Sequence, residues 1–154
     1  MEDEPWYENV VFPALLRHAR TTYGKAMRAA LEEAGYGDIP ANGLYIIGGL
    51  ALGDGEISLR QLVLELGITK QGAGQLVDAL VMRGYLSRAV DESDRRQLIV
   101  ALTERGRAAA EVQGRARDHI DAELLKRVGE NDVRAARKAL ATLIDIRREG
   151  SETK

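Results

Sequence analysis

The sequence predicts a mainly α-helical protein with a small β-hairpin wing, and three observations support this fold class. Residues 58–83 carry two apolar stripes at helical spacing, separated by Gly67. Residues 84–90 and 97–102 alternate apolar and polar side chains on either side of the charged segment 91–96, as a hairpin does. Long segments of helix-forming composition lie before and after this part of the chain. The order predicts a winged helix-turn-helix with additional helices at both ends.

Length and composition are consistent with a cytoplasmic protein. The chain has 154 residues, about one domain, and can bury a hydrophobic core. It contains no cysteine, which excludes disulfides, thiolate metal sites and cysteine redox sensing. No apolar run approaches the roughly 20 residues that span a bilayer. The acidic start, residues 1–5, is the reverse of a signal peptide. We therefore expect no membrane contact.

Charge is distributed unevenly along the chain. The formal net charge is −2. Residues 58–107 hold eight basic and six acidic side chains, a balance of +2, which leaves −4 for the remainder. This asymmetry permits a basic face on the winged segment but does not establish one.

The chain before the winged segment is expected to form two helices. Residues 5–35 have apolar side chains at spacings of three and four, which indicates an amphipathic helix. The helix has two possible starting positions. Pro5 suits the first helical position, whereas Pro13 must either kink the helix or mark its true beginning. A second helix is expected to run from Pro40 to about Leu52.

The helix-turn-helix is the best-specified part of the sequence. Residues 56–57 predict a very short strand, after which Ser58 is a suitable N-cap for the first helix. Gly67 can adopt the positive φ that ends this helix. Thr69 can cap the second helix, which Gly84 terminates. In such a unit the first turn of the second helix enters the major groove of DNA.

The second helix offers candidate base-reading side chains. Ala73, Leu76 and Val77 belong to the inward-facing stripe. The outward positions near the helix start are Lys70, Gln71, Gly74 and Gln75. A glutamine can form two bonds to adenine, and a lysine can reach guanine or phosphate. Gly72 and Gly74 each cost about 1 kcal/mol of helix propensity relative to alanine. They either allow close approach to the DNA backbone or reflect tolerance or packing against a neighbouring helix.

The hairpin loop offers a second contact with DNA. An arginine at a wing tip is attracted to the narrow, negative minor groove without reading one base uniquely. Asp94 lies two residues before Arg96, a spacing at which the carboxylate can hold the guanidinium. The alternative is that residues 91–96 form an ordinary solvated turn. Their position after a helix-turn-helix favours the DNA-binding interpretation.

The winged segment also carries an ordered set of motifs. These are Leu62-x3-Leu66-Gly67-Ile68-Thr69-Lys70-Gln71, Leu76-Val77-Asp78-x-Leu80-x2-Arg83-Gly84-Tyr85-Leu86-x-Arg88, Asp91-x2-Asp94-Arg95-Arg96 and Leu102-Thr103-x2-Gly106. Together they make residues 58–107, and more loosely the whole chain, resemble the MarR family of transcriptional regulators. The resemblance implies an obligate two-fold dimer with interlocked N- and C-terminal helices. It also implies palindromic operators, usually a repressor role, and release of DNA by a small, often phenolic or anionic ligand. By resemblance, Arg96 matches the wing arginine, Asp94 is its salt-bridge partner, and Arg95 is an additional phosphate contact.

The helices after the wing fit such a dimer. Thr103 is a suitable N-cap for a helix that reaches Val128, about 37 Å long at 1.5 Å per residue. Asn131 or Asp132 is expected to cap a final helix. Both helices carry apolar stripes that need each other or a second copy for burial. We expect a homodimer, because two recognition helices must address half-sites about one DNA turn apart. A monomeric bundle is the alternative.

These expectations define the organisation and the candidate sites. Residues 1–154 are expected to form one unit, with a winged DNA-binding lobe at 54–107 and a helical dimerisation lobe at 5–52 and 108–148. The candidate DNA-contacting residues are Ser58, Thr69, Lys70, Gln71, Gly74, Gln75, Arg88, Asp94, Arg95 and Arg96. The candidate ligand-contacting residues are His18, Tyr23 and Tyr45, for which core packing is the alternative. No cofactor or metal is predicted. The expected partners are double-stranded DNA with a palindromic operator, a second copy of the chain and a small-molecule effector.

An enzyme is disfavoured by the same residues. The two histidines, His18 and His119, lie more than 100 positions apart. The sequence also lacks helical i,i+4 metal pairs, a nucleophile elbow and a phosphate loop. A winged-helix module that binds protein or RNA is the alternative function, and the pairing of the wing arginines with Asp94 argues against it.

Overall fold

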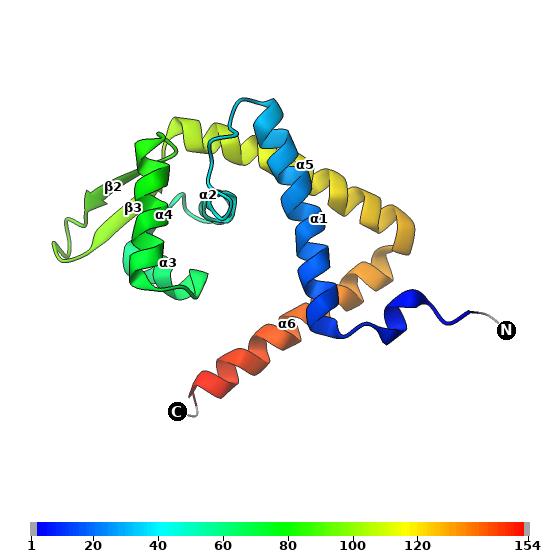
Figure 1. Cartoon of the computed structure of the whole chain (residues 1–154). Helices are drawn as coiled ribbons and strands as arrows, with labels where there is room; N and C mark the ends of the chain where they lie inside the picture. The colour runs from blue at the N-terminus through cyan, green and yellow to red at the C-terminus, as the bar shows by residue number, and fades with distance from the viewer. Residues whose placement is uncertain (1–2, 153–154) are drawn as a thin grey trace. The chain divides into compact units, whose positions relative to one another are not determined.

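The computed structural model describes residues 3–152 and confirms the predicted fold class (Figure 1). Its elements in chain order are η1 (Trp6–Asn9), α1 (Phe12–Glu33), α2 (Gly43–Leu52), β1 (Glu56–Ser58), α3 (Leu59–Leu66), α4 (Lys70–Met82), β2 (Leu86–Val90), β3 (Leu98–Leu102), α5 (Glu104–Val128) and α6 (Glu130–Glu152). The chain divides into two compact units, residues 1–117 and 118–154. No helix among residues 3–152 is long and apolar enough to cross a membrane.

The first helix begins at the second of its two possible starts. Pro13 lies in the first turn of α1, where its missing N–H removes no helical hydrogen bond. Residues 6–9 form a separate 3-10 turn that ends at Val10. Pro13 therefore marks the true beginning of the helix and does not kink it.

Two predicted helix starts were wrong. The second helix begins at Gly43 instead of Pro40, because the segment before it forms turns in which the Gly43 N–H donates to the Pro40 carbonyl at 2.8 Å. The last helix begins at Glu130, and neither Asn131 nor Asp132 caps it. Gly129 has a φ of +84° and turns the chain directly from α5 into α6. Its carbonyl then accepts from the N–H of Val133.

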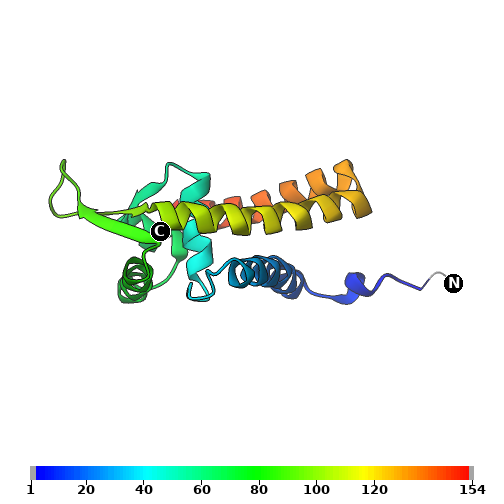
Figure 2. The ribbon, with the colours of Figure 1, turned by 90° about the horizontal axis from the view of Figure 1, so that it is seen from above.

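A three-stranded antiparallel sheet forms the wing and its base. The strand order is β1-β3-β2, with Ser58 opposite Ile99 in one pair and Val90 opposite Leu98 in the other. The short strand expected at residues 56–57 is therefore present as β1 and forms one edge of the sheet. Figure 2 shows the loop between β2 and β3 extending away from the helices of the first unit.

The hydrophobic core lies in the first unit. Its largest fully buried side chains are Tyr85, Leu31, Ile47, Leu80, Leu86, Val77 and Val100. They come from α1, α2, α4, β2 and β3 and from the link between α4 and β2. The core therefore joins the helix-turn-helix, the sheet and the preceding helices into one packed body. In α6, by contrast, none of the residues is buried.

Candidate nucleic-acid interface

The start of α4 presents an exposed polar face. The Thr69 side chain caps the helix by accepting from the Gly72 N–H at 3.0 Å. Ala73 and Val77 are buried beneath the helix, as their positions in the apolar stripe predict. The side chains of Lys70, Gln71 and Gln75 are exposed. The first turn of α4 can therefore offer donors and acceptors to the edges of DNA bases.

The two helical glycines of α4 have different surroundings. A Cβ atom at Gly72 would lie 3.1 Å from Oγ1 of Thr69, so this glycine keeps space beside the N-cap. A Cβ atom at Gly74 would meet nothing within 4 Å. Packing against a neighbouring helix of the first unit therefore does not account for Gly74. Tolerance and close approach to DNA remain as its two explanations.

The first helix of the motif places a further cation beside α4. Ser58 caps α3 by accepting from the Gln61 N–H at 3.1 Å, as its sequence position predicts. Arg60 lies in the first turn of α3 and is exposed. Sequence reasoning did not single out Arg60, because an arginine on the polar face of a helix carries no signal by itself. Only its place beside the wing makes it a candidate.

The wing tip, which we define as residues 91–97, is built from short-range hydrogen bonds. Oδ1 of Asp91 accepts from the backbone and the hydroxyl of Ser93, and these bonds hold the pKa of Asp91 below its usual value. The Asp91 N–H donates to the Gln97 carbonyl, and the Gln97 N–H donates to the Asp94 carbonyl, both at 2.9 Å. The loop is therefore a closed turn.

Asp94 and Arg96 form the pair that their spacing predicts. Oδ1 of Asp94 accepts from the Arg96 backbone at 3.1 Å and from Nε of Arg96 at 3.3 Å. The Arg96 side chain is 92% exposed, whereas that of Asp94 is 35% exposed. Asp94 thus orients the guanidinium while nearly all of it stays accessible. The adjacent Arg95 is also exposed.

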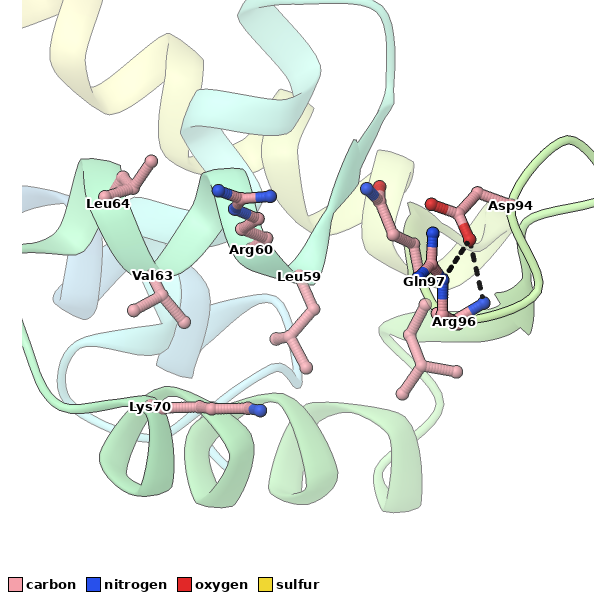
Figure 3. Close-up of a pocket in the computed structure, with 9 residues that line it drawn as sticks. Leu59, Arg60, Val63, Leu64, Lys70, Asp94, Arg96 and Gln97 are labelled. Atoms are coloured by element: carbon pink, nitrogen blue, oxygen red, sulfur yellow. Dashed lines mark hydrogen bonds and ion pairs between the residues drawn. The ribbon is translucent and has the colours of Figure 1, made fainter.

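A groove of about 630 Å³ lies between the helix-turn-helix and the wing (Figure 3). Its apolar lining consists of Leu59, Val63, Leu64 and Leu98. Arg60 of α3, Lys70 of α4 and Arg96 of the wing tip also line it. Among its lining residues in the described chain, Asp94 is the one carboxylate, and it is already bonded to Arg96. Three elements thus bring three cations to one open groove.

Arg88 has a different environment from the other candidates. It lies on β2, and its Nη1 forms an ion pair with Oδ1 of Asp78 on α4. The pair joins α4 to β2, so Arg88 is held between these two elements instead of projecting freely. Asp78 was not predicted, because only the fold brings a residue ten positions away in sequence to this strand.

The three ligand candidates do not share one cavity. Tyr45 lines a groove of about 550 Å³ beside α3 and a hollow of about 260 Å³ beside α1. The guanidinium of Arg20 lies 4.1 Å from the centre of its ring. His18 is exposed on α1 and lines neither space. Tyr23 packs against the hydrophobic core.

Comparison with known proteins finds one matching family model and several similar structures. Residues 38–97 match the model of the MarR family. No curated protein matches the sequence. NadR in complex with 4-hydroxyphenylacetate is similar in structure, with 21% identity, a TM-score of 0.72, and coverage of 93% of this chain and 97% of that chain. A MarR transcriptional regulator from Methanosarcina mazei Go1 has 24% identity, a TM-score of 0.71, and coverage of 89% and 93%. A mutant MarR from E. coli complexed with operator DNA has 19% identity, a TM-score of 0.70, and coverage of 91% and 98%. At these identities, the structural likeness shows a shared fold.

Proposed function

Through residues 38–97 this chain belongs to the MarR family of DNA-binding regulators, and from that premise we propose that it is a homodimeric repressor. The operator is a palindromic duplex, and a small-molecule effector releases it.

The groove between the helix-turn-helix and the wing carries the proposal. Its three cations, Arg60, Lys70 and Arg96, come from the elements that flank a DNA backbone when α4 occupies the major groove and the wing occupies the minor groove. A phosphodiester strand would face these cations in passing from one groove to the other. Gln71 and Gln75 would then read base edges, and Arg95 would contact phosphate.

The apolar surface of the outer helices supports a second copy of the chain as partner. In the second unit, the exposed large apolar side chains are Leu124, Leu125, Val128, Leu140, Leu143, Ile144 and Ile146. At the start of the first unit, they are Trp6, Tyr7, Val11, Phe12 and Leu16. Exposed apolar surface of this extent is typical of a protein interface. A two-fold dimer buries it and presents two recognition helices to one palindrome.

A hollow beside α1 supports an effector with a negative charge. It is lined by Thr21, Gly24, Lys25, Arg28, Ala41, Leu44 and Tyr45, which include two cations and no carboxylate. We propose that it takes a small anion with an apolar body. The structure of NadR contains 4-hydroxyphenylacetate, a ligand of this class. The effector site proposed here uses Tyr45 from the sequence-based set, together with Lys25 and Arg28.

Selection from a pool of random DNA duplexes tests the operator. The protein should enrich an inverted repeat, and the complex should contain two protomers per duplex by mass. Single-stranded RNA of the same length serves as competitor, because an RNA-binding module is the alternative function. Enrichment of no sequence, or preferred binding of the RNA, would contradict the proposal. Addition of 4-hydroxyphenylacetate to the selected complex then probes effector release separately.

A further inference from the structure

The wing root, which we define as Gly84–Tyr85 with Thr103–Gly106, connects the two DNA-reading elements. Tyr85 lies between the end of α4 and the start of β2, and none of its surface is exposed. The Thr103 N–H donates to the Tyr85 carbonyl at 3.1 Å, and the Thr103 hydroxyl donates to the Gly84 carbonyl at 2.5 Å. A displacement of Tyr85 would therefore move the recognition helix, the wing and the start of α5 together.

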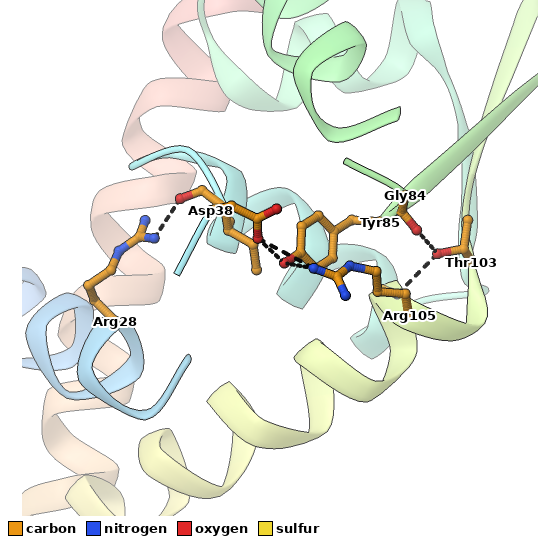
Figure 4. Close-up of polar contacts among 8 residues, drawn as sticks. Arg28, Asp38, Gly84, Tyr85, Thr103 and Arg105 are labelled. Carbon is orange, nitrogen blue, oxygen red and sulfur yellow. Dashed lines mark hydrogen bonds and ion pairs between the residues drawn. The ribbon is translucent and has the colours of Figure 1, made fainter. Parts of the chain in front are cut away.

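The Tyr85 hydroxyl is held by two charged groups from other elements (Figure 4). It donates to Oδ1 of Asp38, in the loop between α1 and α2, and accepts from Nη2 of Arg105 at 3.0 Å. The same Nη2 of Arg105 lies 3.5 Å from Oδ1 of Asp38. The guanidinium also lies over the rings of Tyr85 and Tyr36, at 4.6 and 5.3 Å from their centres. We name Asp38, Tyr85 and Arg105 the polar latch.

The electrostatics of the latch keep the hydroxyl protonated and the carboxylate charged. Burial and the bond to Asp38 raise the pKa of Tyr85 to about 12. The bond from Tyr85 in turn lowers the pKa of Asp38. At neutral pH the Tyr85 hydroxyl is therefore a hydrogen-bond donor and the Asp38 carboxylate is its acceptor.

The loop that contributes Asp38 is held on its other side by α1. Nη1 of Arg28 donates to the Ile39 carbonyl at 2.5 Å, and Nη2 donates to the Pro40 carbonyl at 3.1 Å. Arg28 also lines the hollow proposed for the effector. One arginine therefore faces both a candidate ligand space and the loop that positions Asp38.

We propose that Arg28, the loop it holds and the polar latch form the mechanical link between the effector hollow and the DNA-reading elements. An anion bound in the hollow would compete with the Ile39 and Pro40 carbonyls for the guanidinium of Arg28. The loop would then be released, and with it the Asp38 carboxylate that fixes Tyr85. Arg28 and Asp38 are positioning residues in this scheme, because neither lines the groove proposed for DNA. The inference rests on the function proposed above.

Hydrogen exchange of amides in the intact protein tests the link without DNA or effector. Arg28→Gln should raise exchange at residues 38–42 and also at residues 84–90, which Arg28 does not bond. Arg17→Gln is the matched control, since Arg17 is exposed on the same helix. Arg28→Lys, which keeps the charge but loses the forked donor, is the milder variant if Arg28→Gln fails to fold. A change confined to residues 38–42 would overturn the proposal.

A double-mutant cycle with the selected operator provides the second readout. Arg28→Gln should weaken DNA binding by roughly threefold to tenfold, the scale of coupling through packed networks. In a Tyr85→Phe background, the same change should cause no further loss, because the link is already broken. Additive losses would show that Arg28 and Tyr85 act independently and would overturn the inference. Failure of the wild-type protein to bind any duplex would instead refute the proposed function.

Discussion

The wing tip and the wing root use the same residue types for different purposes. At the tip, Asp94 bonds an arginine two residues away, and the Arg96 side chain remains 92% exposed. At the root, Asp38 and Arg105 meet across 67 positions of sequence around a tyrosine with no exposed surface. The tip holds a side chain outward through local bonds. The root joins distant segments to the end of α4 and the start of β2.

This difference predicts which properties each region controls. Exposed ion pairs contribute little to folding, so changes at the tip should alter DNA binding and leave stability nearly unchanged. Changes at the root remove partly buried contacts around the fully buried Tyr85 and should alter both.

Gly106→Ala should produce the largest effect, because it disrupts the root. A Cβ atom there would lie 2.1 Å from the Tyr85 carbonyl oxygen, a backbone atom that cannot rotate away. We expect a loss of about 3 kcal/mol or more in the free energy of unfolding, measured by urea denaturation. The control is Gly114→Ala on the same helix, where the nearest atom is the end of the Arg117 side chain at 3.6 Å. Equal stability of the two variants would show that the close approach of Gly106 to the Tyr85 carbonyl oxygen does not matter for folding.

Arg96→Ala should weaken operator binding by about tenfold or more, because it removes the minor-groove contact proposed for the wing. Its free energy of unfolding should match that of the wild type. Arg95→Ala removes the same charge from the same exposed loop, and we expect it to cause a smaller loss of affinity. Fluorescence anisotropy with the selected duplex measures both. Identical losses would mean that charge alone, and not the orientation by Asp94, sets the contribution of the tip.

High pH should destabilise the root through Tyr85. Its pKa is about 12 in the folded protein and about 10 when unfolded, so its contribution to stability is complete below pH 10. That contribution is lost as the pH rises from about 10 to 12. Tyr85→Phe should lower stability at pH 7 and show a shallower fall over this range. Tyr36→Phe, which keeps the latch, is the control; a fall as steep in Tyr85→Phe as in wild type would contradict the assignment.

Gly74→Ala should produce the smallest effect, with opposite signs for stability and binding. The added methyl meets no atom within 4 Å and should raise stability by about 1 kcal/mol through helix propensity. If α4 approaches DNA closely at this position, operator affinity should fall. Circular dichroism and anisotropy measure the two quantities. An affinity that is unchanged or increased would leave tolerance as the reason for this glycine.

Local signals explain why much of the fold could be predicted from the sequence. The caps of α3 and α4 at Ser58 and Thr69 and the pair of Asp94 with Arg96 depend on residues two or three positions apart. Apolar periodicity likewise indicates the helices and the hairpin. Such features are visible in a linear sequence because the partners are neighbours.

Long-range contacts explain what the sequence could not predict. The Tyr85 hydroxyl donates to Asp38, which lies 47 positions away in sequence, and no sequence pattern around either residue indicates this bond. Arg28 on α1 likewise bonds the carbonyls of Ile39 and Pro40, and no sequence pattern indicates these contacts. Arg60 became a candidate only when the fold placed α3 beside the wing.

The salt dependence of operator binding tests whether the groove between the helix-turn-helix and the wing contacts DNA. Wild-type affinity should fall steeply with salt, because cations from α3, α4 and the wing displace counterions from phosphates. The variant with Arg60, Lys70 and Arg96 all replaced by alanine should lose several units of the log–log slope while keeping the wild-type free energy of unfolding. A variant that retains the wild-type slope would contradict the assignment of this groove to DNA.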